Sequence, residues 1–229
     1  MSARRGLLIG NSRWHWAEQV DHSWQFRHTP PAPDQLGKDP VIWAAVGRIP
    51  RRSSLNPALR ITLADVSLQG CPAWLGVDRA LGASAAWKIS QRMGLDLSKG
   101  LLLVDAGTVL SQTLLNREGV FEGGQLMPGL QLQLAAMAMG TKSLPASSHD
   151  HDVPIDFPKQ TKDAMVRGAI QSMVGSVLES SRLSGACVWL CGGDAETLAD
   201  QIGRTGQPGI LLDPDLVMKG LVDLLNTVN

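Results

Sequence analysis

The sequence contains no tyrosine and only 3 phenylalanines, although 7 tryptophans are present. Cysteine is also scarce, with 3 residues in a chain of 229. An odd number of cysteines without a signal peptide favours reduced thiols over a disulfide framework, and this predicts a cytoplasmic protein. The cysteines and histidines also lack the paired spacing of zinc ligands, which argues against a zinc site.

Net charge and long apolar runs are missing as well. The 21 Lys and Arg residues balance 21 Asp and Glu residues, so there is no electrostatic reason to expect nucleic acid or an anionic membrane as a partner. No apolar run approaches the roughly 20 residues that a membrane-spanning helix needs. The apolar run after Arg4 and Arg5 ends at Gly10, too early for a signal peptide. The sequence therefore predicts no nucleic acid and no membrane as partner.

Apolar residues make up 44% of the chain, which is enough to bury a sizeable core. Short apolar runs predict three strands within residues 5–27, further strands at 41–47 and 60–66, and a helix at 79–94. The plan then repeats, with three strands within 100–129, helices at 129–140, 161–182, 195–204 and 215–227, and strands at 186–193 and 209–212. This repeat predicts an α/β fold of two related lobes, residues 1–98 and 99–229, with a cleft between them.

The first turns of the two lobes, LLIGNS (7–12) and LVDAGT (103–108), occupy equivalent places in the repeat. Glycine allows close backbone approach and Thr108 supplies a hydroxyl, so both are candidate phosphate-binding turns. The Asp105 carboxylate lies beside such a turn and would repel a bound phosphate, so a cation is needed between the two anions. An ordinary turn at each place remains the alternative interpretation.

Three further segments carry chemistry: FEGGQLMPGL (121–130), CGGDAE (191–196) and PAWLGVDRAL (72–81). The first leads into a helix N-terminus, which favours anions. In the second, Gly192 and Gly193 carry no side chains, so a purine could lie directly against their backbone. In the third, Asp78 could accept a hydroxyl proton while Arg79 holds an anionic or amide-bearing substrate. Each segment also has a purely structural interpretation, as a bend, a strand-to-helix connection or a helix start.

Two other features have structural explanations. SHDHD (148–152) alternates His and Asp like a metal site, but it lies in a polar loop where such residues are solvated. Trp14 and Trp16 alternate along one expected strand and so share a face. We expect them to pack in the core or against a partner subunit in preference to stacking on adenine.

In their order along the chain, these segments resemble type III pantothenate kinases, a family of the acetate/sugar kinase, Hsp70 and actin superfamily. The resemblance extends over nearly the whole chain, and the GxDR and FxGGxxxPGL motifs are its most specific parts. The matching elements are GNS (10–12), PxxLGxDR (72–79), DAGT (105–108), GxFxGGxxxPGL (119–130), TKSLP (141–145), TxxAxxxG (161–168) and CGGDA (191–195).

The resemblance implies two ribonuclease-H-like lobes with an inter-lobe active-site cleft, in a homodimer. It implies that ATP phosphorylates the primary hydroxyl of pantothenate to 4'-phosphopantothenate, the first step of coenzyme A biosynthesis. The implied cofactors are ATP, Mg²⁺ and a monovalent cation, K⁺ or NH₄⁺.

The resemblance also implies roles for individual residues. Asp78 would be the catalytic proton acceptor, and Asp105 would hold the monovalent cation. Substrate binding is implied for Gln69, Gly76, Val77, Arg79 and Thr161. ATP binding is implied for Gly10, Asn11, Ser12, Arg13, Thr108, Gly192 and Gly193.

The sequence departs from the family pattern at three positions. Leu8 stands where an aspartate usually lies near the nucleotide's metal, and a leucine cannot ligate Mg²⁺. Gln69 replaces a substrate-contacting tyrosine, and Thr113 replaces an acidic residue. Because Asp78 and Arg79 remain, we expect an active kinase. The alternatives are a non-catalytic regulatory or binding member of the fold, and a kinase for another small hydroxyl compound.

Overall fold

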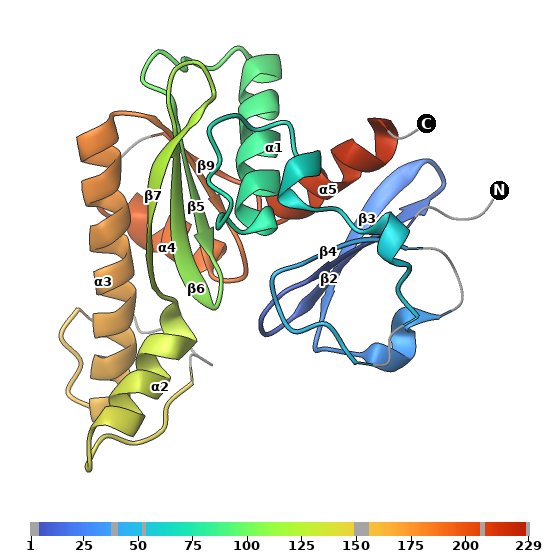
Figure 1. Ribbon diagram of the computed structural model, residues 1–229. Coiled ribbons are helices and arrows are strands. Elements are labelled where there is room, and N and C mark those ends of the chain that lie inside the picture. Colours follow the sequence, from blue (N-terminus) through green and yellow to red (C-terminus); the bar gives the residue numbers. More distant parts are fainter. Residues whose placement is uncertain (1–4, 38–40, 52–53, 149–155, 207–208, 228–229) are drawn as a thin grey trace. The chain divides into compact units, whose positions relative to one another are not determined.

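The computed structural model describes residues 5–37, 41–51, 54–148, 156–206 and 209–227 (Figure 1). It divides into two compact units. The first contains residues 1–95, 118–122 and 215–229, and the second contains residues 96–117 and 123–214. The C-terminal residues 215–229 belong to the first unit, because the C-terminal helix packs against the helix at residues 77–93.

The first unit is built on a four-stranded sheet of order β3-β2-β1-β4. Its strands are β1 (Arg5–Ile9), β2 (Trp14–Val20), β3 (Ser23–Thr29) and β4 (Ile42–Ala45). The first three form an antiparallel meander, and β4 pairs parallel with β1. Helices α1 (Val77–Met93) and α5 (Leu216–Thr227) pack against each other. The 3-10 helices are η1 (Pro33–Leu36), η2 (Pro57–Leu59) and η3 (Leu63–Asp65).

The two faces of this sheet have different neighbours. Trp14 and Trp16 lie on one face within a buried apolar cluster, with ring centroids 6.1 Å apart. The expectation that they pack in the core is therefore confirmed. The opposite face is turned toward α5, since a Cβ at Gly6 would lie 3.2 Å from Leu221 of that helix. Side chains alternate along a strand, so Leu8 shares this second face with Gly6.

The expected strand at residues 60–66 is wrong. Arg60 makes a single parallel bridge to Trp43, and the chain then turns into η3. Both the backbone N–H and the hydroxyl of Thr62 donate to Asp65 Oδ2, at 2.8 and 2.7 Å. This capping box stabilises a helical turn at the place where the apolar pattern alone favoured a strand.

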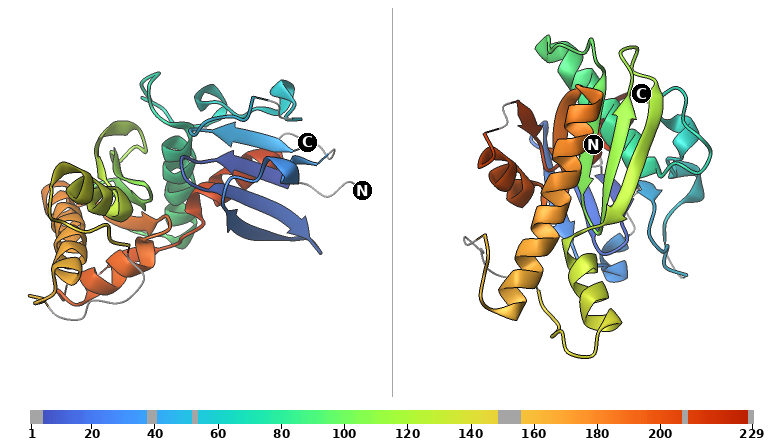
Figure 2. Two further views of the ribbon diagram at one scale, coloured as in Figure 1. Left: turned by 90° about the horizontal axis from the view of Figure 1, so that it is seen from below. Right: turned by 90° about the vertical axis from the view of Figure 1, so that its left-hand side faces the viewer.

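The second unit is built on a five-stranded sheet of order β7-β6-β5-β8-β9. Strand β5 pairs antiparallel with β6 and parallel with β8, which pairs parallel with β9. Helices α3 and α4 share one buried core with β5 and β8, and Figure 2 shows α3 running along this sheet. The elements are β5 (Leu101–Ala106), β6 (Val109–Leu115), β7 (Phe121–Pro128), α2 (Leu130–Gly140), α3 (Thr161–Ser184), β8 (Cys187–Cys191), α4 (Ala195–Gly203) and β9 (Ile210–Leu212).

The two units repeat one plan, as the sequence predicted. Each has three consecutive strands that lie side by side, the first two antiparallel, and the first of them pairs parallel with a later strand. This confirms the α/β fold class with two ribonuclease-H-like lobes. Across the described ranges, none of the helices is both long and apolar enough to cross a membrane.

Candidate functional site

The turn at Gly10–Arg13 joins β1 to β2 in the first unit. It is closed by a hydrogen bond of 3.0 Å from the Gly10 N–H to the Arg13 carbonyl. Asn11, Ser12 and Arg13 are exposed, so a ligand can reach their backbone and side chains. Leu8 is only 4% exposed and carries no polar atom on its side chain. The turn therefore has the accessibility that a phosphate site needs, without a carboxylate at its base.

Gly47 holds this turn in place, although it is not among the residues predicted from the sequence. The backbone N–H groups of Val46 and Gly47 both donate to the Ile9 carbonyl, at 3.0 and 2.9 Å. A Cβ at Gly47 would overlap the carbonyl of Gly10. The only sequence signal is a glycine at the end of the apolar run VIWAAVG (41–47). Its contact with Gly10 depends on the parallel pairing of β1 with β4.

The segment Gly76–Arg79 lies at the start of α1, next to Val46 at the end of β4. Gly76 is the N-cap of this helix, and a Cβ there would lie 3.6 Å from Val46 Cγ1. The first unit thus brings the segment Gly76–Arg79 close to the Gly10 turn, with Val46 and Gly47 between them. Both segments are among the motifs predicted from the sequence to bind ligands.

Asp78 is a carboxylate with a perturbed environment. Its Oδ1 accepts a hydrogen bond of 2.8 Å from the Arg79 N–H. Burial raises the pKa of Asp78, and this is partly offset by the backbone N–H and the positive charge of Arg79. The Arg79 side chain is itself buried. A carboxylate with a raised pKa is a stronger base than an ordinary aspartate, as proton abstraction from a hydroxyl requires.

Gln69 is exposed, while its backbone is fixed against the start of β7. Its carbonyl accepts a hydrogen bond of 2.9 Å from the Phe121 N–H. Gly70 has φ +77°, and a Cβ there would lie 2.7 Å from Val120 Cγ1. The position of residue 69 is therefore set by backbone contacts that do not depend on its side chain.

The second unit forms a corresponding turn at Asp105–Thr108, between β5 and β6. The Gly129 N–H donates to the Thr108 carbonyl at 3.0 Å. Gly129 is the N-cap of α2, and a Cβ there would overlap the Gly107 carbonyl. The absence of a side chain at Gly129 therefore lets the N-terminus of α2 lie directly on this turn.

The connection from β8 to α4 lies against the same turn. Gly192 has φ +91°, and a Cβ there would overlap the Asp105 carboxylate and the Ala106 backbone. The Asp194 N–H donates to the Ala106 carbonyl at 2.9 Å. Gly193, next to it, is exposed. The second unit thus brings together the predicted residues Asp105, Thr108 and Gly192, while Thr161 is an exposed residue at the start of α3.

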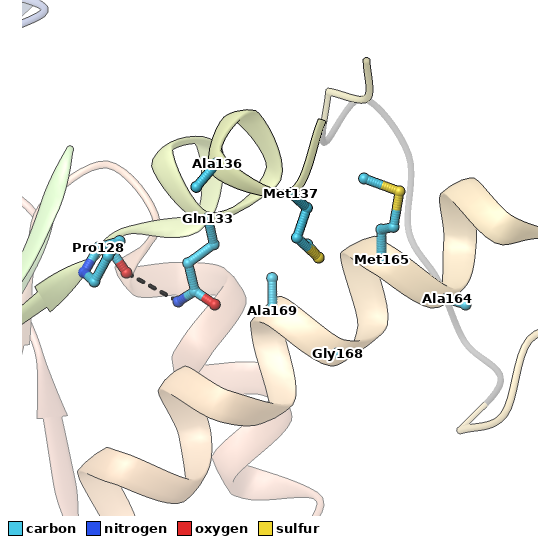
Figure 3. A pocket seen from close by; sticks show the side chains of 8 residues that line it. All are labelled: Pro128, Gln133, Ala136, Met137, Ala164, Met165, Gly168 and Ala169. Atoms are coloured by element: carbon cyan, nitrogen blue, oxygen red, sulfur yellow. Dashed lines mark hydrogen bonds between the residues drawn. The ribbon is translucent and has the colours of Figure 1, made fainter. Parts of the chain in front are cut away.

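A cavity of about 370 Å³ lies between α2 and α3 (Figure 3). Met137 and Met165 line it, and Gln133 Nε2 donates to the Pro128 carbonyl at 2.9 Å. Its lining contains no charged side chain and no predicted site residue. Within the described ranges no group of three metal-ligating side chains occurs. Residues 149–152 of the SHDHD segment lie outside those ranges.

Comparison with known sequences gives a consistent result. A family model described as type III pantothenate kinase matches residues 64–182. A type III pantothenate kinase from Synechococcus elongatus is 30% identical over 249 residues, covering 96% of this chain and 95% of the relative. One from Rhodopirellula baltica is 35% identical over 174 residues, covering 72% of this chain and 60% of the relative.

Solved structures agree at the level of the fold. A Baf family protein from Campylobacter jejuni matches with a TM-score of 0.68 at 18% identity, over 98% of both chains. An activator of the 2-hydroxyisocaproyl-CoA dehydratase from Clostridium difficile, with bound ADPNP, matches with a TM-score of 0.52 at 12% identity, over 99% of this chain and 97% of that one. The sequence matches establish the finer relationship: the chain belongs to the type III pantothenate kinase family.

Proposed function

We propose that this protein transfers the γ-phosphoryl group of ATP to the primary hydroxyl of pantothenate, giving 4'-phosphopantothenate and ADP. One observation carries the proposal. The first unit places a partly buried carboxylate, Asp78, at the helix start beside Val46, whose neighbour Gly47 supports the Gly10 turn. A candidate base and a turn suited to phosphate therefore lie close together in the first unit, with Val46 and Gly47 between them.

Asp78 is assigned the catalytic role. Phosphoryl transfer depends on alignment and charge neutralisation, with little covalent help from the protein. Ionised Asp78 orients the substrate hydroxyl and accepts its proton as the oxygen–phosphorus bond forms. Arg79 suits an anionic or amide-bearing substrate, and we assign pantothenate binding to Gln69, Gly76, Val77, Arg79 and Thr161.

Nucleotide binding is assigned to turns of both units. In the first unit, exposed Asn11, Ser12 and Arg13 and the backbone of Gly10 offer donors to phosphate oxygens. In the second unit, the assigned residues are Thr108, Gly192 and Gly193. The N-terminus of α2 at Gly129 adds partial positive charge to the turn that carries Thr108.

Asp105 is assigned to a monovalent cation, K⁺ or NH₄⁺. Its carboxylate lies against Gly192, where a Cβ would occupy the space next to Asp105 Oδ1. The backbone carbonyl of Ala106 lies beside the same space. This all-oxygen donor set fits a hard cation. A divalent cation, Mg²⁺, would neutralise the triphosphate when bound with ATP. In the first unit, the exposed Asn11 and Ser12 side chains offer oxygens to it or to its waters, whereas Leu8 offers none.

The three cysteines support a cytoplasmic location. Cys71, Cys187 and Cys191 form no disulfide bonds. Reduced thiols are typical of proteins that work in reducing compartments, and we propose the cytoplasm on this ground.

We also propose that the protein is a homodimer in which α2 contributes to the interface. The helix is rich in apolar residues, yet Leu132 is 42% exposed and Met139 is 88% exposed. Leu126 on β7 is 61% exposed as well. Apolar surface gathered on neighbouring elements is typical of a contact with another chain.

The double substitution Leu132→Glu with Met139→Glu is expected to convert the dimer to a monomer, because it places charges in an apolar contact. Size-exclusion chromatography with light scattering measures the mass directly. Leu183→Glu at the end of α3, where the side chain is 66% exposed, is the matched control and should leave the dimer intact. A monomeric parent protein, or a doubly substituted protein that remains dimeric, would contradict this assignment.

The proposed reaction is tested by measuring ADP release from ATP in the presence of Mg²⁺ and K⁺, with and without pantothenate. We expect release that depends on pantothenate and saturates with it. Release with a sugar but not with pantothenate would favour a kinase for another hydroxyl compound. ATP binding without turnover on any acceptor would favour a non-catalytic binding protein.

A further inference from the structure

A row of polar side chains crosses the sheet of the first unit beside Leu8. Leu8 on β1 pairs with His15 on β2, and His15 pairs with His28 on β3, so the three lie on one face. His15 Nδ1 lies 2.7 Å from His28 Nδ1, and His28 Nε2 lies 2.9 Å from Asp215 Oδ1. Asp215 immediately precedes α5. A hydrogen-bonded chain therefore runs from the start of α5 to His15.

The order of the protons in this chain follows from the chemistry of its members. As a carboxylate, Asp215 only accepts, so His28 Nε2 donates to it. When His28 is neutral, its single N–H is the one given to Asp215, so His28 Nδ1 accepts the hydrogen of His15 Nδ1. His15 Nε2 is then left with a lone pair and no hydrogen. Burial is the main cause that lowers the pKa of His15 to about 4, and this keeps the ring neutral at pH 7.

His15 Nε2 faces the backbone of the phosphate turn. A Cβ on Gly10 would lie 3.2 Å from it. In the second unit, a Cβ on Gly107 would lie 3.6 Å from Asp105 Oδ1. Asp105 and Leu8 correspond, since each precedes the glycine of its turn by two residues. The first turn thus has the imidazole nitrogen of His15 as a nearby acceptor, where the second turn has a carboxylate oxygen.

We propose that His15 Nε2 accepts a hydrogen bond from a water on the divalent cation of the bound nucleotide, in place of the carboxylate that Leu8 lacks. His28 and Asp215 are positioning residues that fix the tautomer of His15. The inference rests on the proposed function only in that ATP binds with a divalent cation at the Gly10 turn. Mg²⁺ retains several waters in proteins, and these waters donate hydrogen bonds. A neutral imidazole nitrogen accepts such a bond, whereas an imidazolium cannot.

The tautomer is tested first, by nitrogen–proton NMR correlation of the imidazole rings in the full-length protein. We expect His15 to carry its hydrogen on Nδ1, and its Nε2 resonance to shift when Mg²⁺ and a non-hydrolysable ATP analogue are added together. A hydrogen on His15 Nε2, or an Nε2 resonance that is unchanged by the metal–nucleotide complex, would overturn the proposal. This measurement needs no substitution and so does not depend on how a variant folds.

Variants then test the role in metal binding without any turnover. We expect His15→Ala to raise the Mg²⁺ concentration that half-saturates binding of a fluorescent ATP analogue by about 10–100-fold, the usual effect of losing an outer-shell partner. His15→Gln, which keeps an acceptor near the same position, should restore part of this loss, and His28→Ala should show a smaller loss than His15→Ala. His22→Asn, in the turn between β2 and β3, is the matched control and should bind as the parent does.

The outcomes separate this inference from the proposed reaction. If His15→Ala binds the analogue with the Mg²⁺ dependence of the parent protein, His15 has only a structural role in pairing β2 with β3. If the parent protein shows the expected Mg²⁺ dependence but does not phosphorylate pantothenate, the role of His15 stands and the proposed reaction fails.

Discussion

Replacement of Asp78 by asparagine is expected to lower kcat for pantothenate-dependent ADP release by about 10²–10⁴-fold, the usual contribution of a positioned base. The asparagine retains an oxygen that can accept the hydrogen bond now given by the Arg79 N–H at 2.8 Å. The substitution therefore removes the proton acceptor while keeping the local backbone arrangement. Steady-state kinetics with varied pantothenate measures the effect.

The pH dependence should agree with this role. Because burial raises the pKa of Asp78, the parent enzyme is expected to lose kcat/KM with falling pH at values above the usual aspartate pKa of about 3.9. Burial also makes ionised Asp78 unfavourable for folding at higher pH. Asparagine has no such cost, so the melting temperature of Asp78→Asn at pH 7 should not fall below that of the parent.

Asp34→Asn is a matched control, since Asp34 is an exposed aspartate in the first turn of η1 in the same unit. It should leave kcat unchanged. An Asp78→Asn enzyme as active as the parent would show that another group, or solvent, accepts the proton.

Substitution of Gly47 by alanine is expected to lower kcat/KM for ATP by about 100-fold. The added Cβ would overlap the Gly10 carbonyl, so either the Gly10 turn or the end of β4 must move. A displacement of about 1 Å at a reacting or positioning group can cost on the order of 10²-fold in rate. Such overpacking is also expected to lower the free energy of unfolding by about 1–3 kcal/mol.

Gly175→Ala is the matched control for this change. Gly175 lies within α3, and a Cβ there meets nothing within 4 Å. Alanine in a helix interior should raise the free energy of unfolding by roughly 0.5–1 kcal/mol, with no change in kinetics. The role assigned to Gly47 would be wrong if Gly47→Ala kept the parent's kcat/KM for ATP.

The sequence predicted those structural features that depend on residues close together in the chain. The spacing of apolar residues predicted the internal repeat and the helix at 79–94, and α1 ends at Gly94, an αL C-cap. The strand expected at residues 60–66 failed for an equally local reason. The side chain of Asp65 bonds back to Thr62 and favours a turn, and this competes with the apolar alternation of the segment.

Other features depend on contacts between distant parts of the chain. The Gly47–Gly10 contact requires the parallel pairing of β1 with β4. His28 and Asp215 are 187 residues apart in the sequence, and they meet only because α5 returns to the first unit. No short motif could reveal such contacts. The aspartate missing at Leu8 was visible in the sequence, whereas the imidazole beside Gly10 required the register of β1 and β2.

The central claim is tested most directly by identifying the product. The protein, ATP, Mg²⁺, K⁺ and pantothenate are incubated, and the mixture is analysed by phosphorus NMR and mass spectrometry. We predict a phosphomonoester on the primary hydroxyl of pantothenate, equimolar with ADP and greatly reduced with Asp78→Asn. Unmodified pantothenate, with ATP intact or hydrolysed to inorganic phosphate, would contradict the account.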